Sequence, residues 1–329
     1  MKQRKLGQNG PQIGAVGYGA MSFTDFYGPA DDNQSLRVLD ACLDLGITHL
    51  DTSNAYGMGR SENVIGQWIK NHKGEMPFSI ATKVGITRNP ENRFDNSKGY
   101  LTKSLDESLS RLGVEAIDLY YVHRRDTRHE IEDVTETMAG FVKQGKIKAI
   151  GYSEISPASL RRAHAVHPIA AVQSEYSLST RAPELGLIQL CKEIDATLVA
   201  FSPVGRSLLT DRPHSAEAVA TMPFLTQNPR FCAPNLDYNL AYNKEFRALA
   251  ADVGVSAATL AIAWVLHQND NIIAIPGTRK VEHLSEVAQG GSFDLTPEIL
   301  QKLEDILPVG WAHGDRYSVT QWNGPERYC

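Results

Sequence analysis

The chain has 329 residues, with 33 basic and 38 acidic side chains and a formal net charge of −5. Hydrophobic residues make up 42% and charged residues 22%, as in an ordinary globular protein. The acidic balance argues against nucleic-acid binding, because such proteins usually gather an excess of basic residues on one face. The longest apolar run, Leu260–Leu266, is far shorter than the ~20 residues of a membrane-spanning helix. We therefore expect neither a nucleic-acid partner nor a membrane.

The cysteines and the N-terminus indicate the compartment. The four cysteines (Cys42, Cys191, Cys232 and Cys329) are scattered and form no CxxC pair, as expected for reduced thiols in the cytosol. The N-terminus carries positive charge, but no apolar segment of the kind found in secretion signals follows it. No set of His, Cys or carboxylate residues has the spacing of metal ligands. We expect a cytoplasmic protein without a metal site, either a monomer or a weak homo-oligomer.

The elements follow a regular order along the chain. Asn9-Gly10 predicts a hairpin turn between short segments near Leu6 and Ile13. Eight short apolar runs come next, each followed by a stretch with helical spacing of its apolar residues. The runs cover residues 16–19, 47–50, 78–82, 117–122, 147–152, 170–172, 197–201 and 272–275. Their nearly continuous apolar character is typical of parallel strands that are buried on both faces.

Eight such units predict an α/β fold, a (β/α)8 TIM barrel with an N-terminal β-hairpin and long substrate loops. A doubly wound open sheet uses similar units, but the count of eight favours closure. Two longer irregular stretches stand out, residues 211–240 and the tail after Leu307. No linker or change of composition divides the chain, so we expect one domain over residues 1–329.

Polar residues end three consecutive predicted strands, and in a barrel the chemistry lies at the carboxyl ends of the strands. Asp51, Lys83 and His123 occupy these ends, and Tyr56 follows shortly after the first. Taken singly, they could be a turn cap, a solvated lysine and a satisfied core histidine. Neighbouring strands bring their ends together, and pairing an acid with an ammonium lowers the cost of burying both. A joint functional role is therefore favoured.

These residues lie within stretches that resemble the aldo-keto reductase family over essentially the whole chain. The matching stretches include Gly46–Gly57, Ser108–Gly113, Ile117–Arg124, Gly145–Glu154, Phe201–Arg206 and Ile275–Thr278. The pair Ser153-Glu154 and the segment Arg161–Pro168 resemble the branch that contains perakine reductase and its bacterial relatives. We interpret His164 and His167 within that segment as surface helix residues rather than as a metal pair.

The resemblance implies that Asp51, Tyr56, Lys83 and His123 form a catalytic tetrad for carbonyl reduction. Tyr56 would give a proton to the carbonyl oxygen, although an unperturbed phenol has a pKa of ~10. The Lys83 ammonium favours the phenolate and so strengthens the acid, while Asp51 keeps Lys83 charged. A neutral His123 would donate a hydrogen bond to the substrate carbonyl or share the proton with Tyr56.

No side chain donates hydride, so the expected cofactor is NADPH (NADP+). The chain has no GxGxxG fingerprint, but the loops after the seventh and eighth strands form the usual phosphate site of a barrel. Arg279 and Lys280 precede a predicted helix and suit the 2′-phosphate. The cofactor residues that we predict, partly from the resemblance, are Gly19, Met21, Asp51, Ser153, Glu154, Gln173, Phe201, Ser202, Pro203, Gly205, Arg206, Gly277, Thr278, Arg279, His283, Glu286 and Val287. Three of them depart from the wider family, which usually has asparagine at 154, arginine or glutamine at 283 and asparagine at 287.

The expected partner is a small-molecule carbonyl substrate, held by residues in the loops above the tetrad. The candidates are Met21, Phe23, Tyr27, Tyr56, His123 and Arg124. Two other functions stay open. One is a Schiff-base barrel aldolase that uses Lys83, disfavoured because Asp51 would keep that amine protonated. The other is a nicotinamide-binding sensor or regulatory subunit on the same fold.

Overall fold

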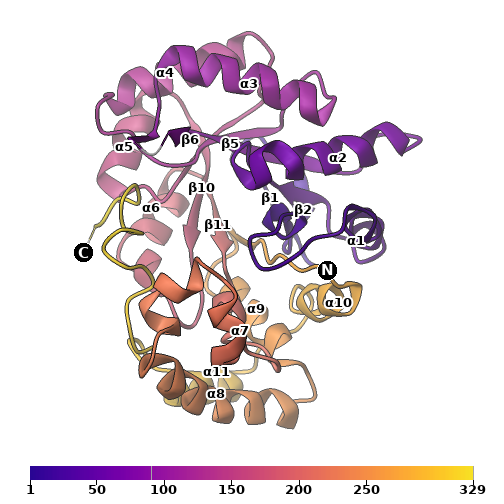
Figure 1. The fold of residues 1–329 in the computed structure, drawn as a ribbon, viewed down its shortest axis with the longest axis vertical. Helices are drawn as coiled ribbons and strands as arrows, with labels where there is room; N and C mark the ends of the chain where they lie inside the picture. Colours follow the sequence, from indigo (N-terminus) through magenta and orange to yellow (C-terminus); the bar gives the residue numbers. More distant parts are fainter. Residues whose placement is uncertain (90, 329) are drawn as a thin grey trace.

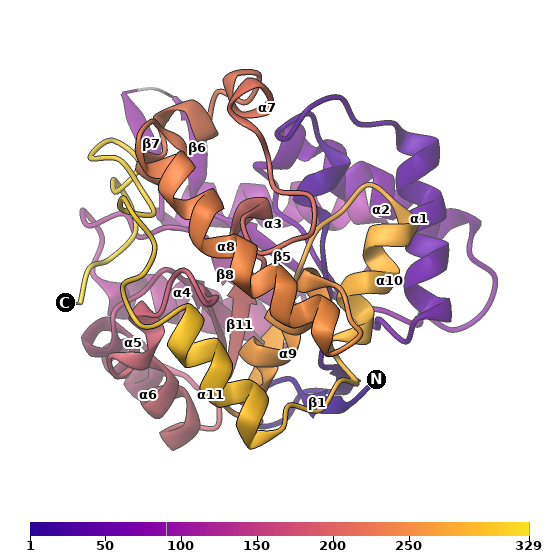
Figure 2. The ribbon, with the colours of Figure 1, turned by 90° about the horizontal axis from the view of Figure 1, so that it is seen from below.

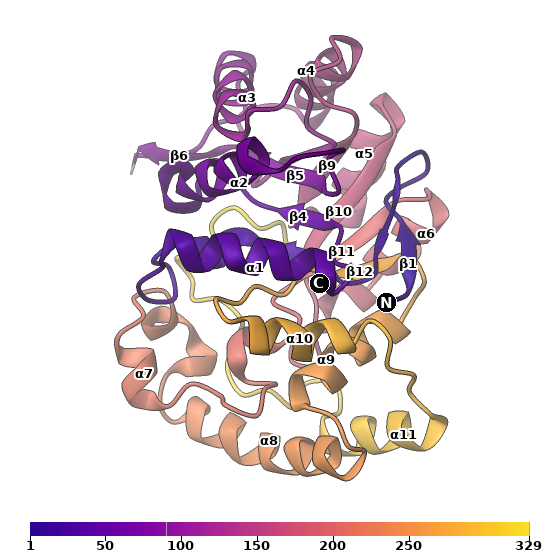
Figure 3. The same cartoon turned by 90° about the vertical axis from the view of Figure 1, so that its right-hand side faces the viewer.

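The computed structural model describes residues 1–89 and 91–328, except for the side chain of Arg88. The chain begins with the predicted hairpin, in which β1 (Gln3–Lys5) pairs antiparallel with β2 (Gln12–Gly14). Leu6 and Ile13 beside it belong to the apolar cluster that fills the barrel interior. The hairpin lies at one end of the barrel (Figure 3) and closes its amino-terminal face.

Eight strands form one parallel sheet, as the sequence predicts (Figure 1). They are β3 (Tyr18–Gly19), β4 (His49–Asp51), β5 (Ser79–Val84), β8 (Leu119–Val122), β9 (Ile150–Ser153), β10 (Ile169–Glu175), β11 (Thr197–Phe201) and β12 (Ile272–Ala274). Neighbours in the chain are neighbours in the sheet, from β3 to β12. A parallel bridge between Val16 and Ala274 joins the two edges and closes the barrel. The (β/α)8 fold is confirmed.

Helices surround the strands. The ring consists of α1 (Asp32–Asp44), α2 (Arg60–Asn71), α3 (Lys98–Leu112), α4 (Ile131–Lys143), α5 (Pro157–Val166), α6 (Leu187–Glu193), α9 (Ala257–His267) and α10 (Val281–Gln289). Side chains of Asp31, Ser97, Ser156 and Ser256 cap the amino termini of α1, α3, α5 and α9. The helix α8 (Asn235–Asp252) packs on α9 and α11 (Pro297–Ile306) packs on α8, outside the ring (Figure 3). Because α8 covers it, α9 is apolar on nearly all sides.

Two glycines allow the first strand to close against the last. A Cβ on Gly277 would lie 2.5 Å from the carbonyl oxygen of Gly19, and a Cβ on Gly19 would lie 2.7 Å from that of Ile275. Any larger residue would push these backbones apart. Both glycines were predicted to approach the cofactor, and the structure shows in addition that they close the barrel.

Some predicted boundaries differ from the structure. The sixth strand extends to Glu175, three residues beyond the apolar run, because its end carries the polar side chains Gln173 and Glu175. The stretch 211–240, expected to be irregular, contains α7 (Ala216–Ala220) and the first turns of α8. A second hairpin, β6 (Ile86–Asn89) with β7 (Asn92–Phe94), follows the third barrel strand.

Across the described residues, no single helix is long and apolar enough to cross a membrane. Only α8 and α9 taken together, bent by 90° at their junction, pass that test by length and composition.

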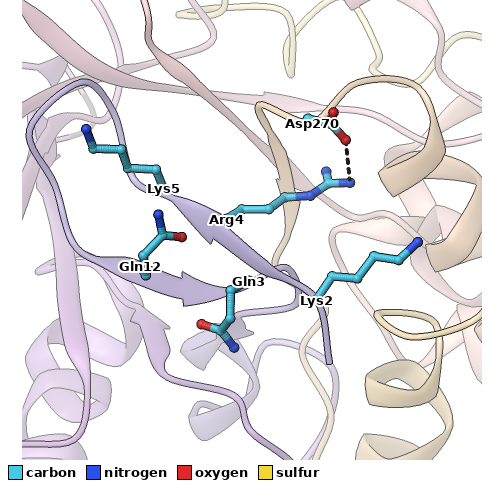
Figure 4. Close-up of a pocket in the computed structure, with 6 residues that line it drawn as sticks. All are labelled: Lys2, Gln3, Arg4, Lys5, Gln12 and Asp270. Atoms are coloured by element: carbon cyan, nitrogen blue, oxygen red, sulfur yellow. Dashed lines mark ion pairs between the residues drawn. The ribbon is translucent and has the colours of Figure 1, made fainter.

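Arg4 fastens the hairpin to the barrel at the face opposite the strand ends. Its guanidinium is 8% exposed and donates to the carbonyl oxygens of Leu266 at 2.5 Å, Asn269 at 2.8 Å and Ile272. These oxygens belong to the end of α9, the start of β12 and the loop between them, so Arg4 joins the hairpin to all three. Figure 4 shows Arg4 among the residues that line a pocket here, pointing toward Asp270 at 4.0 Å. The positive charge here is structural.

We expect Arg4→Ala to lower the free energy of unfolding by about 2–4 kcal/mol, because several buried carbonyl oxygens lose a charged donor. Urea denaturation measures this. The matched control is Lys5→Ala, one residue along the same strand but exposed, which should change stability by less than about 0.5 kcal/mol. Equal losses in the two variants would contradict this role for Arg4.

Candidate active site

Three strand ends bring the predicted tetrad together. Lys83 at the end of β5 is fully buried, and its Nζ donates to Asp51 Oδ1 on β4 and, at 2.8 Å, to the carbonyl oxygen of Thr52. The same Nζ lies 3.3 Å from the Tyr56 hydroxyl. Asp51 is 2% exposed, so this ion pair is excluded from water. The lysine is therefore held between a carboxylate and the predicted proton donor.

Tyr56 stands on a short turn (Tyr56–Gly59) just beyond β4 and is partly exposed. Its ring meets the His123 imidazole edge to face, with centroids 5.8 Å apart. His123 follows β8, and its Nδ1 lies 3.1 Å from Ser53 Oγ. The phenol thus faces the barrel mouth with an ammonium on one side and an imidazole on the other.

The charge states of the two flanking groups follow from their surroundings. Burial disfavours the Lys83 ammonium, but Asp51 and Tyr56 more than offset this, so the pKa of Lys83 lies above its usual value. Burial, Arg124 and Lys83 all hold the pKa of His123 well below its usual value. Near neutral pH the site therefore contains a charged lysine and a neutral histidine.

Gln173 fixes the other side of Asp51. Its Nε2 donates to Asp51 Oδ2 at 2.7 Å, and the side chain is 3% exposed. We predicted a role for Gln173 at the cofactor, and the structure adds that it orients the carboxylate that holds Lys83.

A second group of buried charges adjoins the tetrad on β9 and β10. The Glu154 carboxylate accepts hydrogen bonds from both terminal nitrogens of Arg316, a residue of the C-terminal tail. Glu175 accepts both terminal nitrogens of Arg206, at 3.0 and 2.7 Å. Arg230 lies 3.9 Å from Glu175 and donates to Thr180 Oγ1. The Glu154 carboxylate is paired with Arg316, and the Arg206 guanidinium is paired with Glu175. Neither charged group is therefore free to bind the cofactor.

Aromatic rings alternate with these guanidinium groups. Arg206 stacks over Phe224 and Tyr317, and Arg316 stacks over Tyr317 and Trp322, at 4.6–5.4 Å from the ring centroids. Each contact is of the cation–π kind, which strengthens when water is excluded. The stack fastens the tail, yellow in Figure 2, beside the β6–β7 hairpin.

The loop after β11 presents backbone donors. Ser202, Arg206 and Ser207 have positive φ angles of 49°, 52° and 85°, which non-glycine residues rarely adopt. The amide of Arg206 has no acceptor among the described residues, while Ser207 ends the 3-10 turn Gly205–Ser207. A free amide in a loop of this conformation suits an anion such as a pyrophosphate. Phe201, partly exposed, and the buried Pro203 border the same loop.

The predicted 2′-phosphate region lies at the start of α10. Lys280 at its N-cap makes no side-chain capping bond, and the amides of its first turn are free within the described residues. Arg279 donates to the carbonyl oxygens of Tyr27 at 3.0 Å and Pro29 at 2.5 Å, which holds the loop after β3 over this helix.

Other predicted residues lie around the same helix. Thr278 accepts a bond from the Tyr18 hydroxyl at 2.6 Å, and His283 is partly exposed. Glu286 is paired with Arg212 at 2.9 Å, so one predicted adenosine contact already has a partner. Val287 is 6% exposed and packs in the core.

Of the predicted substrate residues, Met21, Tyr27, Tyr56 and Arg124 are partly exposed and His123 is 7% exposed. Phe23 is different, and the prediction that it lines the substrate site is wrong for this conformation. It is fully buried, with its ring 5.1 Å from that of Tyr18, because the turn after β3 directs it into the core.

Sequence reasoning missed Glu175, Arg230, Arg316 and Tyr317. Glu175 carried a usable signal, since an acid follows Gln173 at a strand end, as Asp51 does on β4. Arg316 and Tyr317 lie in a tail without periodicity, and only tertiary packing brings them to the barrel mouth.

One group of metal-ligand type lies elsewhere in the described chain, where atoms of Asp95, Asp126 and His129 come within 4.8 Å of one another. The Asp126 carboxylate already accepts hydrogen bonds from three nitrogens of Arg128. The group is therefore accounted for by a loop ion pair.

Comparison with known proteins shows which family this chain resembles. The model of the Aldo/keto reductase family matches residues 15–308. The chain is 36% identical over 327 residues to probable aldo-keto reductase 1 of Glycine max, covering 98% of this chain and 93% of that protein. It is 38% identical over 320 residues to aldo-keto reductase yakc [NADP(+)] of Schizosaccharomyces pombe, covering 95% and 94%.

Among solved structures, the glycerol dehydrogenase AKR11B4 of Gluconobacter oxydans superposes with a TM-score of 0.81 at 28% identity. The match covers 93% of this chain and 94% of that one. The chain belongs to the aldo/keto reductase family.

The buried Glu154–Arg316 pair should make the free energy of unfolding depend on pH. Burial alone would raise the pKa of Glu154, but Arg316 lowers it to about 2, so the pair stabilises the fold above about pH 4.5 and less as the pH falls toward 2. Glu154→Gln removes the close carboxylate partner of the buried Arg316 guanidinium and leaves it with the more distant Glu175, at 3.7 Å, so it should cost about 3–5 kcal/mol at pH 7. The difference from wild type should shrink between pH 5 and pH 3.

Urea denaturation across this pH range measures the effect. Glu193→Gln, which breaks the exposed pair with Arg161, is the control and should cost less than about 1 kcal/mol. A pH-independent difference for Glu154→Gln would contradict the assignment.

Proposed function

We propose that this protein reduces aldehydes and ketones to alcohols, reversibly, with NADPH as the hydride source. The observation that carries the proposal is the position of Lys83 Nζ, in contact with Asp51 and 3.3 Å from the Tyr56 hydroxyl, beside a neutral His123. An acid, its activating ammonium and an uncharged hydrogen-bond donor then face the same point at the barrel mouth.

The residues present fit the cofactor. The free amide of Arg206, in the loop after β11, suits its pyrophosphate, and the open start of α10 with Lys280 suits a phosphate at the other end. Phe201 offers an accessible ring face at the end of β11 for the nicotinamide. When bound, NADPH supplies the hydride that no side chain can.

Tyr56 delivers the proton. As negative charge develops on the carbonyl oxygen, the phenol proton moves to it, and the nearby Lys83 ammonium stabilises the phenolate left behind. Asp51, oriented by Gln173, keeps Lys83 protonated and in place. His123 is neutral and so can donate one hydrogen bond to the carbonyl oxygen without competing for the proton.

The two other functions are disfavoured by the same contacts. A Schiff-base aldolase needs a neutral lysine, whereas Asp51 and Tyr56 raise the pKa of Lys83. A sensor without turnover would not need the complete acid, ammonium and imidazole set that the described residues form.

Finer points of the proposal rest on sequence. The Ser153-Glu154 pair supports a place in the perakine-reductase-like branch, as a bacterial member. We further propose one domain over residues 1–329, a cytoplasmic location, and a monomer or weak homo-oligomer that acts on small carbonyl compounds without nucleic acid or membrane. The scattered cysteines and the acidic charge support these points.

Tyr56→Phe tests the proton donor. Removing the hydroxyl should reduce kcat for an aldehyde such as 4-nitrobenzaldehyde by about 10²–10⁴-fold, since general acid catalysis is lost. The Kd for NADPH, measured by quenching of tryptophan fluorescence, should change less than threefold. Turnover at the wild-type rate would remove Tyr56 from this role.

Arg279→Ala tests the phosphate end of the site. The Kd for NADPH should rise about tenfold or more, while the Kd for NADH changes little, because only NADPH carries the 2′-phosphate. Arg37→Ala, an exposed change on α1, is the control for general charge effects. Equal losses for both nucleotides would place the 2′-phosphate contact elsewhere.

A further inference from the structure

The barrel mouth carries more positive than negative charge, although the whole chain is acidic. Buried and half-buried charges gather at the strand ends and where the loop after β11 and the tail meet them. The cations are Lys83, Arg124, Arg206, Arg230 and Arg316, and the carboxylates are Asp51, Glu154 and Glu175. A cleft with a charge excess of one sign attracts ligands of the other sign.

Each of the three carboxylates has its own cation. Asp51 holds Lys83, Glu154 holds Arg316, and Glu175 holds Arg206. Arg230 shares Glu175 with Arg206, at 3.9 Å, whereas Arg124 forms no ion pair among the described residues.

Arg230 is not accessible to a substrate. Its side chain is 12% exposed, 3.9 Å from Glu175, and its nitrogens donate to Thr180 Oγ1 at 2.6 Å and to the Gly314 carbonyl oxygen at 3.2 Å. Burial lowers the pKa of Arg230 to about 10. It serves to hold the tail against the strands.

Arg124 differs from Arg230 in its exposure to solvent and in its lack of a carboxylate partner among the described residues. It follows His123 directly and is partly exposed, and no carboxylate lies within ion-pair distance of it in the described part of the chain. Its Nη1 donates to the His123 carbonyl oxygen at 2.7 Å and to Ser153 Oγ at 3.1 Å, so the guanidinium spans the ends of β8 and β9. Its other nitrogens have no hydrogen-bond partner among the described residues.

The backbone of Arg124 is also held in place. Asn96 Nδ2 donates to its carbonyl oxygen at 3.2 Å. The charge is felt by the neighbours, since it lowers the pKa of both His123 and Glu154. A preorganised guanidinium with free donors, beside the group that orients the carbonyl, is suited to bind an anion.

We propose that the substrates are carbonyl compounds that carry an anionic group, a carboxylate or a phosphate, and that Arg124 binds this group. The inference rests on the proposed reductase function and adds the substrate class. The anion takes the place of the carboxylate partner that Arg124 lacks, while His123 and Tyr56 engage the carbonyl oxygen at the other end.

Matched substrates test this. With NADPH, kcat/KM is measured for 4-carboxybenzaldehyde, for 4-formylphenyl phosphate and for the neutral methyl 4-formylbenzoate. The wild-type ratio of an anionic substrate to the ester should be about 10–100, as for a charge-assisted contact. The larger of the two anionic ratios tells carboxylate from phosphate.

Arg124→Met should bring the anionic-to-ester ratio to about one, and Arg124→Lys should keep part of it. Arg37→Met, a remote exposed change, should leave the ratio as in wild type. As a second readout, benzoate should bind the enzyme–NADP+ complex at least tenfold more tightly than benzamide, and Arg124→Met should remove this difference.

The possible results distinguish an error in the proposed substrate class from an error in the proposed reductase function. If wild type reduces the ester but shows no preference for either anion, the inference fails and the reductase function stands. If Arg124→Met lowers all rates in proportion and keeps the ratio, Arg124 only positions Ser153 or His123, and the inference again fails. If wild type reduces none of the aldehydes, the proposed function fails and the inference with it.

Discussion

The buried ion pair of Lys83 and Asp51 is the interaction on which the rest of the site depends. An ammonium inside the barrel is stable only next to a carboxylate, and Asp51 can serve only because β4 and β5 are neighbours in register. The pair fixes the point that the Tyr56 hydroxyl must reach, and its charge helps to keep His123 neutral. Barrel order thus determines the charge states that the chemistry needs.

A second group of buried ion pairs joins the ends of β9 and β10 to distant parts of the chain. Glu154 and Glu175, at the ends of β9 and β10, are joined through Arg206 to the loop after β11 and through Arg316 to the C-terminal tail. The backbone amide of Glu326 adds a bond to the Glu154 carbonyl oxygen. The tail is therefore part of the site and not an appendage. Its removal would leave the Glu154 carboxylate buried without its ion-pair partner.

The sequence was sufficient to predict the barrel and to bring Asp51, Lys83 and His123 together at its strand ends, because both depend on local patterns. Apolar runs of strand length alternate with helical stretches, and Asp51, Lys83 and His123 follow three of those runs directly. It was not sufficient for groups whose partner is distant in the chain. The guanidinium of Arg206 is paired with Glu175, which no local pattern indicates, and Phe23 was predicted at the substrate but packs on Tyr18. Nothing in a linear pattern indicates that residue 316 meets residue 154.

The most direct test of the central claim is to follow NADPH absorbance while the purified protein acts on an excess of methyl 4-formylbenzoate, with the alcohol product quantified. The account predicts many turnovers per protein molecule, with one NADPH oxidised for each alcohol formed. Binding of NADPH without oxidation would indicate a sensor. Loss of aldehyde without NADPH oxidation, with borohydride trapping an adduct on Lys83, would show a neutral lysine nucleophile. Either result would contradict the proposed reductase function, and the second would also contradict the assignment of Lys83 as the charged partner of Tyr56.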